Sequence, residues 1–476
     1  MSFAQETVDF LASKEARVPA NDARQLATDA IVDAIGCIGL GAREPLERPL
    51  RAGLFGPISA KAMTAALTDA ASEDTTAERR DSLSLYLGTL AHAADFDDIS
   101  HPAYCHPTAV LLPPLLIRGA VLGASGAEFI AAYIAGIEVL GQLGRRLNLD
   151  HYHRGWHATG TLGTLGATAA LAMLERLPVD SAKNALGIAA SMAGGLRANF
   201  GTPVKPLHAG LAGRSAILAT RLAAAGFTSS ASAIDGDKGF FRTFGGAPGI
   251  AESKPWADPP EILTKNGIAL KAYPSCAATH AAVDATLAAR TTLGAPKLLH
   301  VRQIRVGASR HALQPLIYDR PTTPLEAKFS MRHCVGAAFL DGSLTLRSFT
   351  NGSLARPELK EIMEKVVVEV DPRVAEDPEF AAIVTVALTN GAEAEHRIDI
   401  ASGKPGNWPT SESLRDKFLM CAGGGQADEL YHLARSLSEM PDVRALLDEI
   451  AKMIGFALGT TDSGPVEKET VHGALA

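Results

Sequence analysis

Cysteine is scarce in this chain, and its spacing excludes two kinds of structural site. The sequence of 476 residues has five cysteines, an odd number, and contains no Cys-x-x-Cys pair. They are scattered along the chain at Cys37, Cys105, Cys276, Cys334 and Cys421. Neither a disulfide framework nor a structural zinc site is therefore expected.

An excess of basic charge is missing too. Lys and Arg number 45 against 52 Asp and Glu, the net charge is −7, and no block of basic residues occurs. A nucleic-acid partner is therefore not expected. The sequence also lacks the glycine-rich motifs that bind nucleotides and dinucleotides. We expect no cofactor.

Long hydrophobic runs are absent as well. The N-terminus has no basic region followed by an apolar run, so it does not resemble a signal peptide. The uncharged run 159–174 is too short and too rich in glycine to span a bilayer, and we interpret it as a buried helix. These features predict a cytoplasmic protein with no membrane partner.

What the chain does have is aliphatic: hydrophobic residues make up 47% and aromatic residues only 5%. Abundant Ala and Gly favour helices that pack closely. Apolar residues at helical spacing predict helices up to about residue 225, and again at 411–422, 426–438 and 441–457. The fold class is therefore mainly α.

Strand signals are confined to one part of the chain. Beta-branched runs occur at 366–370 and 383–388, and Asn390-Gly391 after the second run is a strong hairpin signal. Helical segments alternate with them, which predicts a smaller α+β domain over 263–405. The remaining helices, 1–262 with 406–464, are predicted to form one large all-helical domain, and 465–476 a frayed tail.

The densest polar stretch is 92–107. It holds three carboxylates, three imidazoles and two prolines that end the preceding helix. The acids and bases are Asp95, Asp97, Asp98, His92, His101 and His106. A polar loop at the end of an apolar helix is a common place for catalysis.

Three further stretches carry candidate site residues. The segment 151–161 includes Tyr152, Arg154 and His157 and leads into a helix whose N-terminus favours an anion. The segment 197–210 is predicted to be a loop that presents Lys205. The segment 271–280 places Lys271 before a proline turn, with Ser275 and Thr279 expected to cap the helix that carries His280.

This inventory suits proton transfer on a small polycarboxylate. Histidines and carboxylates move protons, while lysines hold carboxylates and the charge that develops beside them. Two other classes remain open. One is a metallohydrolase that uses His92, Asp95, Asp98, His101 and His106, or His153 and His157, although the spacing matches no specific metal motif. The other is a helical binding protein without catalysis.

Six ordered motifs resemble the MmgE/PrpD family, which includes 2-methylcitrate dehydratase, cis-aconitate decarboxylase and iminodisuccinate epimerase. The resemblance runs over nearly the whole chain. The motifs are Asp-Ala-Ile-Gly-Cys-Ile-Gly-Leu-Gly (33–41), Ala-His-Ala-Ala-Asp-Phe-Asp-Asp (91–98), Gly-Trp-His-Ala-Thr-Gly-Thr (155–161), Lys-Pro-Leu-His-Ala-Gly (205–210), Lys-Ala-Tyr-Pro-Ser-Cys (271–276) and Glu-Ala-Lys-Phe-Ser-Met (326–331).

The resemblance implies a homodimer of two-domain subunits, in which the α+β domain is a lid over a cofactor-free, metal-free cleft. Carried over by motif, the implied catalytic residues are Asp95, His106, His157, Lys205 and Lys271. The implied substrate-binding residues are Tyr152, Arg154, Ser275, Cys276 and His280. His157 or His106 is expected to move the proton, and the two lysines to hold carboxylates.

Two departures bear on the reaction. The chain has Asp98-Ile99 where the decarboxylase branch has Asp-Thr, and Ser275-Cys276 where decarboxylases and methylcitrate dehydratases carry a histidine. Elimination, epimerisation and decarboxylation share the same first carbanion-like step, and we expect this enzyme to abstract a proton next to a carboxylate. We expect a lyase of the 2-methylcitrate or citrate dehydratase type. The alternatives are an epimerase or isomerase of an iminodisuccinate-like dicarboxylate and a cis-aconitate-type decarboxylase.

Overall fold

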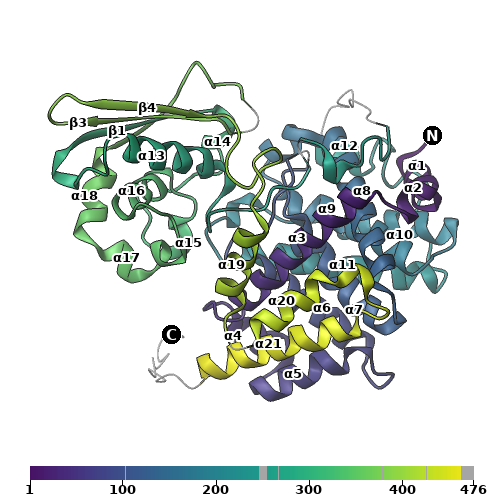
Figure 1. Cartoon of the computed structure of the whole chain (residues 1–476). Coiled ribbons are helices and arrows are strands. Elements are labelled where there is room, and N and C mark those ends of the chain that lie inside the picture. The colour runs from purple at the N-terminus through teal and green to yellow at the C-terminus, as the bar shows by residue number, and fades with distance from the viewer. Residues whose placement is uncertain (102, 246–254, 266, 378–379, 425, 463–476) are drawn as a thin grey trace, which may run out of the picture.

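The computed structural model describes residues 1–476 except 102, 246–254, 266, 378–379, 425 and 463–476. The chain is mainly α, with a large helical body and a smaller α+β domain, as the sequence predicts (Figure 1). The predicted frayed tail, 465–476, lies outside the described residues.

In the described part of 1–263, the helical body has fifteen α- and 3₁₀-helices, the latter labelled η. They are α1 (Phe3–Ala12), α2 (Lys14–Arg17), α3 (Asn21–Gly41), α4 (Glu47–Phe55), α5 (Ala60–Thr68), η1 (Asp69–Ala71), α6 (Ala77–His92), α7 (Pro107–Leu122), α8 (Gly126–His153), α9 (Ala158–Leu174), α10 (Val179–Met192), η2 (Arg197–Asn199), α11 (Val204–Ala224), α12 (Phe240–Gly245) and η3 (Glu261–Leu263).

The C-terminal segment returns to this body. Its helices are α19 (Ser411–Ala422), α20 (Ala427–Arg435), η7 (Leu437–Glu439) and α21 (Arg444–Asp462). In Figure 1 the yellow α19 and α20 lie beside the purple α3, and α21 lies along α5. One hydrophobic core draws buried residues from 3–270 and from 414–458, so both ends of the chain build the same body.

The smaller domain has a core of its own, formed by buried residues within 278–401. Its elements are η4 (Ala277–Thr279), α13 (His280–Thr292), η5 (Leu298–His300), β1 (Val301–Ala308), α14 (Arg310–Leu313), α15 (Pro324–Ala327), α16 (Met331–Asp341), η6 (Leu346–Phe349), α17 (Asn351–Ala355), α18 (Pro357–Lys365), β2 (Val366–Val370), β3 (Ala382–Leu388) and β4 (Glu393–Ile398).

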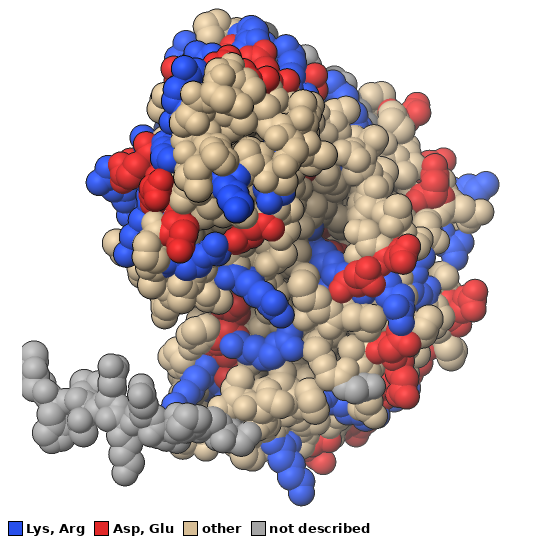
Figure 2. All heavy atoms as spheres, turned by 60° about the vertical axis from the view of Figure 1, so that its left-hand side comes forward, with Lys and Arg blue, Asp and Glu red and all other residues tan. Residues whose placement is uncertain are grey.

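The four strands form one sheet in the order β2-β1-β3-β4. Strands β1 and β2 are parallel, with Ile304 opposite Val366, and the other pairs are antiparallel. The predicted hairpin is present: Leu388 N–H donates to the carbonyl of Ala392, and Gly391 has a φ of +90°. Helices α13, α16 and α18 pack below the sheet (Figure 1), whereas basic and acidic side chains intermingle on the domain's surface (Figure 2).

One predicted loop is a helix. The sequence predicts a loop over 197–210, but α11 begins at Val204 and Lys205 lies in its first turn. Pro203 and Pro206 are tolerated there because the first turn of a helix needs no N–H donors. The predicted cap of the His280 helix is also wrong: the Thr279 hydroxyl donates to the Cys276 carbonyl and caps no helix N–H.

Glycines let α6 and α11 approach closely. A Cβ on Gly210 would lie 2.2 Å from the Leu85 carbonyl oxygen, and one on Gly88 would lie 2.9 Å from Gly210 Cα. Any larger residue would therefore push the helices apart. This crossing brings the C-terminal end of α6, with His92, next to the N-terminal end of α11, with Lys205.

The longest helix, α8, is apolar enough in Gly126–Leu147 to cross a membrane by length and composition. However, 89% of its most apolar window is buried inside the protein. This burial is that of a core helix.

Candidate active site

The loop between α6 and α7 carries the centre of the site. It contains Asp95, and His106 at its end is the N-cap residue of α7. Asp95 has a φ of +54° and Tyr104 a φ of +49°, both in the left-handed region that is unfavourable for residues other than glycine. Such backbone geometry persists where surrounding contacts hold it, which is common at functional sites.

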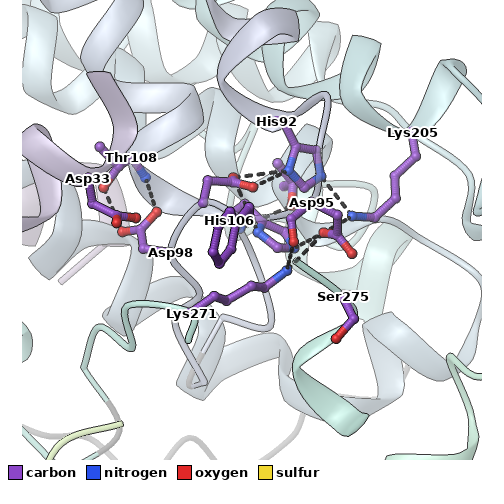
Figure 3. A network of polar contacts seen from close by, with 12 residues as sticks. Asp33, His92, Asp95, Asp98, His106, Thr108, Lys205, Lys271 and Ser275 are labelled. Carbon is purple, nitrogen blue, oxygen red and sulfur yellow. Dashed lines mark hydrogen bonds and ion pairs between the residues drawn. The ribbon is translucent and has the colours of Figure 1, made fainter. Parts of the chain in front are cut away.

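Two lysines hold the same oxygen of Asp95. Lys205 Nζ lies 2.7 Å and Lys271 Nζ 2.9 Å from Asp95 Oδ1. Lys271 also donates to the backbone carbonyl of Asp95 at 2.8 Å. Figure 3 shows the two side chains reaching Asp95 from two sides. Lys205 comes from the first turn of α11, and Lys271 comes from the segment before the smaller domain. Asp95 therefore links the helical body to that segment.

The charge of this cluster is strongly perturbed. Burial alone would raise the pKa of Asp95, but the ammonium groups of Lys205 and Lys271 bring that pKa well below its usual range. Burial lowers the pKa of Lys205, and Asp95 opposes that shift. Asp95 Oδ2 is buried and accepts no hydrogen bond from the described residues, so it is available to a substrate.

A second carboxylate, Asp97, orients His92 and lies beside His106. His92 Nε2 lies 2.8 Å from Lys205 Nζ, and because an ammonium can only donate, His92 accepts there and carries its proton on Nδ1. That proton is donated to Asp97 Oδ1 at 2.9 Å. His106 Nδ1 lies 3.3 Å from Asp97 Oδ2, and its Nε2 lies 3.6 Å from Asp95 Oδ1.

Both histidines are neutral at physiological pH. Burial lowers the pKa of His106 to about 3, and the neighbouring His92 adds to this shift. Burial also lowers the pKa of His92, against the opposing effect of Asp97. Conversely, His92 and His106 overcome the effect of burial on Asp97 and hold its pKa well below the usual range. A neutral imidazole beside an ionised carboxylate can accept a proton.

His157 approaches the cluster from the N-terminus of α9. It is 1% exposed, and its Nδ1 lies 2.9 Å from Nδ1 of His208 on α11. Burial lowers its pKa well below the usual value, and the positive charge of Lys205 contributes in the same direction.

Some of these side chains line one small cavity between the two domains. Its free volume is about 30 Å³, which holds one or two water molecules and no organic acid. A substrate therefore enters only when part of the wall moves. The wall is formed by Asp95, Ile99, Tyr104, His106, Tyr152, His157, Phe200, Lys205, Lys271, Cys276, Ala277, Pro315, Phe329 and Phe380.

All five residues predicted to be catalytic line this cavity, together with Tyr152 and Cys276. Three residues predicted to bind substrate do not. Arg154 ends α8 with its side chain exposed. The Ser275 hydroxyl bonds to that of Thr279, and His280 Nε2 lies 3.3 Å from the Ser275 carbonyl, so both are used inside the turn.

The arginine beside the site is Arg197, which was not predicted. Its guanidinium lies 3.7 Å from the centre of the Tyr152 ring and donates to the Tyr152 carbonyl. It thus supports one wall of the cavity. The predicted site also omitted His92, Asp97 and His208. The sequence does indicate these three residues, because each lies in a polar motif that also contains a predicted site residue.

Lys417 holds the site from behind. Its ammonium donates to Asp33, to the Phe96 carbonyl at 2.8 Å and to the Lys271 carbonyl at 2.9 Å. Helix α19, the first helix of the C-terminal segment, therefore links the loop of Asp95 to the backbone of Lys271 through Lys417.

Asp98 turns away from the cavity. It accepts from Thr108 N–H at 3.1 Å and from the Thr108 hydroxyl at 2.6 Å (Figure 3). Burial raises its pKa well above the usual value, and the neighbouring charges of Asp97 and Asp33 contribute. The surroundings of Asp98 therefore disfavour its charged form, and its contacts with Thr108 are structural.

A different set from either predicted metal site could surround a cation. Ligand atoms of His92, Asp95, Asp97 and His106 lie within 4.8 Å of one another. The ammonium of Lys205 already bonds to two of these residues, His92 and Asp95. A divalent cation would have to displace it and meet the charge of Lys271, so these residues fit a metal poorly. His101 lies against Phe380, and His153 stacks on His311.

The chain is similar to known cis-aconitate decarboxylases. It is 30% identical to the *Mus musculus* enzyme over 351 residues, which is 70% of this chain and 69% of that protein. It is 29% identical to the *Homo sapiens* enzyme over 382 residues, 75% and 77% of the two chains. The identity to the *Aspergillus terreus* enzyme is 25% over 470 residues, 90% and 91% of the two chains.

Both parts of the chain match one family. Residues 5–253 match the MmgE/PrpD N-terminal domain, which covers most of the helical body. Residues 273–435 match the MmgE/PrpD C-terminal domain, which includes the sheet. With the relatives above, these matches show that the chain belongs to the MmgE/PrpD family.

Proposed function

We propose that this protein is a lyase that decarboxylates a small unsaturated tricarboxylic acid of the cis-aconitate type. The observation that carries the proposal is the pair of buried ammonium groups at one oxygen of Asp95, in a cavity that also contains neutral His106 and His157. Lysines hold carboxylates, and the imidazoles move a proton, without any need for a redox group. The names of the relatives support the same reaction.

The reaction follows from the substrate's chemistry. The bond from a CH₂ carbon to its carboxylate breaks, CO₂ leaves, and the electron pair forms a new double bond to the central carbon. The electron pair of the old double bond takes a proton at the carbon next to another carboxylate. The products are CO₂ and an unsaturated dicarboxylate, and one proton is consumed.

Some residues of the site bind negative charge, and others transfer the proton. In this proposal Lys205 and Lys271 bind the carboxylate beside the carbon that is protonated, where negative charge develops. His157 supplies the proton, and His106 with Asp97 faces the same space. Asp95 holds the two ammonium groups together until a substrate carboxylate arrives.

The sequence predicts dehydration first, with decarboxylation as an alternative. The relatives favour it over 2-methylcitrate-type dehydration, because those named here are all cis-aconitate decarboxylases. One observation supports the runner-up reactions, dehydration or epimerisation of a dicarboxylate. Cys276 lines the cavity where a histidine is expected in decarboxylases, and burial raises the pKa of its thiol, with Asp95 contributing.

The test is proton NMR with chelator-treated protein and separate samples of cis-aconitate, citrate, 2-methylcitrate, malate and iminodisuccinate. Loss of a carboxylate from cis-aconitate, with CO₂ release, supports the proposal. A vinyl signal from citrate or 2-methylcitrate without CO₂ would replace it with dehydration. Deuterium exchange in D₂O without a new product would replace it with epimerisation.

The proposal includes a cytoplasmic homodimer that needs no cofactor. Light scattering measures the subunit number. A single-subunit mass at working concentration would contradict the dimer, and activity restored only by added Zn²⁺ or Mn²⁺ would contradict the cofactor-free mechanism.

A further inference from the structure

Two buried histidines share one proton beside the cavity. Nδ1 of His157 and Nδ1 of His208 lie 2.9 Å apart. A neutral imidazole has one N–H and one lone pair, so this contact requires a single proton between the two nitrogens. The pair therefore has two neutral arrangements, with that proton on either ring.

Glycines make room for the pair. A Cβ on Gly195 would lie 3.2 Å from Cγ and 3.3 Å from Nδ1 of His208, and Gly195 has a φ of +135° that suits only glycine. A Cβ on Gly160 would lie 3.3 Å from Cβ of His208. The carbonyl of Gly195 also accepts the His157 backbone N–H at 3.0 Å. The backbone thus holds both rings in place.

The two rings have different surroundings. His157 lines the cavity, and because its Nδ1 is used by His208, its Nε2 is the nitrogen left for a substrate. His208 lies behind it, 6% exposed, and its Nε2 makes no hydrogen bond to the described residues. This nitrogen is therefore the one that remains for proton exchange on the far side of the pair.

The environment opposes a charged imidazole at this position. The groups that face the pair are Lys205 on α11, His92 on α6 and His106 before α7. Burial, Lys205, the partner ring and His92 all lower the pKa of His157, and burial lowers that of His208 to about 4. A donor that has to pass through an imidazolium would be poorly populated here.

We propose that His208 is a positioning residue that sets the tautomer of His157 and shifts the shared proton when His157 acts as the acid. This rests on the proposed function. As the Nε2 proton of His157 bonds to the substrate carbon, the shared proton moves from His208 Nδ1 to His157 Nδ1. His208 Nε2 then takes a proton from water, and both rings stay neutral.

The pair resets by the reverse shift. After product leaves, His157 Nε2 takes a proton from water in the cavity, its Nδ1 proton returns to His208 Nδ1, and His208 Nε2 gives its proton back to solvent. Each turnover consumes one proton from water, which matches the proton that the reaction requires.

His208→Asn tests the proposal. The Asn amide oxygen can accept the His157 Nδ1 proton, so the ring stays in place, but the amide cannot pass a proton. The variant should bind substrate with KM almost unchanged and lose about 100-fold in kcat near neutral pH. Its kcat should rise as the pH falls, because His157 must then act as an imidazolium, whereas wild-type kcat should show no such rise.

The matched control is His151→Asn. His151 is 1% exposed, and burial lowers its pKa to about 4, but its Nε2 bonds to the Thr161 hydroxyl and it does not line the cavity. This variant should keep the wild-type pH profile. A His208→Asn enzyme with wild-type kcat, or with kcat lowered equally at every pH, would overturn the proposal.

A second measurement does not depend on turnover. In ¹⁵N-histidine-labelled protein the shared proton should produce an ¹⁵N–¹⁵N coupling between the two rings, present in His151→Asn and absent in His208→Asn. Absence of this coupling from the wild type would overturn the shared proton. If the coupling is present and no acid in the substrate panel reacts, the proposed function fails instead.

Discussion

Lys205 Nζ lies 2.7 Å from Oδ1 of Asp95, and that oxygen also accepts from a second lysine. One carboxylate thus holds two ammonium groups in a buried cavity and leaves its other oxygen without a protein donor among the described residues. Asp95 thereby stabilises the protonated form of both lysines in the free enzyme, since unpaired buried lysines would lose their protons. A substrate carboxylate can then compete for both ammonium groups.

Asp95→Asn should therefore abolish most activity. The change removes the carboxylate charge that the two lysines share, and breaking a buried ion pair costs about 3–5 kcal/mol. We expect kcat/KM to fall at least about 100-fold and the free energy of unfolding to fall by a few kcal/mol. Steady-state kinetics and urea unfolding measure the two effects.

The matched control is Asp98→Asn, three residues along the same loop. Burial raises the pKa of Asp98 well above its usual value, so an uncharged amide suits this position. The amide oxygen can accept from Thr108 N–H, and the amide NH₂ can donate to the Thr108 hydroxyl oxygen. Activity should stay within about threefold of wild type. Equal losses in the two variants would contradict the assignment of the functional charge to Asp95.

Cys276→His tests how the cavity selects its reaction. The thiol is a wall group of the cavity, whereas an imidazole would add a proton donor or acceptor to the wall that also contains Lys271. If the site is of the decarboxylase type, this variant should release CO₂ from cis-aconitate about tenfold faster than wild type. Cys276→Ser is the control and should leave the rate within a few-fold. A slower Cys276→His enzyme would favour the dicarboxylate reactions.

Lys417→Met should disturb the site from outside the cavity. The variant loses the bonds from α19 to the Phe96 and Lys271 carbonyls and leaves Asp33 buried without its cation. We expect kcat to fall about tenfold with a smaller change in KM, and the stability to fall by about 3 kcal/mol. Lys417→Arg should recover part of both. Wild-type kcat in Lys417→Met would show that the loop needs no support from α19.

Stability should fall in mild acid. Burial lowers the pKa of His106 and His280 to about 3 and of His151 and His333 to about 4. Below the unfolded value near 6.5 the unfolded chain binds protons that the folded chain does not, so stability is lost as the pH falls through this window. Each histidine should contribute about 2 kcal/mol by pH 5.

Urea unfolding between pH 7.5 and pH 5 measures this loss. His333 lies in α16 of the smaller domain and does not line the cavity. Replacing it by Asn should lower the number of protons taken up on unfolding by one, and the free energy of unfolding should then depend less steeply on pH. A free energy of unfolding that is constant over the range would show that these histidines are protonated in the folded protein.

Much of the fold could be predicted because its signals are local. Helical spacing and the Asn390-Gly391 turn indicate the elements, and these patterns can be recognised without knowledge of tertiary contacts. Lys205 shows the limit. The two prolines around it predict a loop, yet prolines are acceptable in the first turn of a helix, and α11 begins at Val204.

The site was predictable by motif but not by direction of side chains. Arg154 lies two residues after Tyr152, but the end of α8 leaves it exposed, while Arg197 reaches the same tyrosine from another segment. Asp97 and Asp98 are neighbours whose pKa values shift in opposite directions, because one faces two histidines and the other a threonine. Such differences depend on three-dimensional packing, and spacing along the chain cannot distinguish them.

The most direct test of the account is CO₂ release from cis-aconitate by chelator-treated wild-type protein, measured together with Asp95→Asn and His157→Asn. We predict turnover by the wild type, with one CO₂ and one unsaturated dicarboxylate per substrate consumed, and at least a 100-fold loss in both variants. No CO₂ from the wild type, or equal rates in all three proteins, would contradict decarboxylation at this cluster.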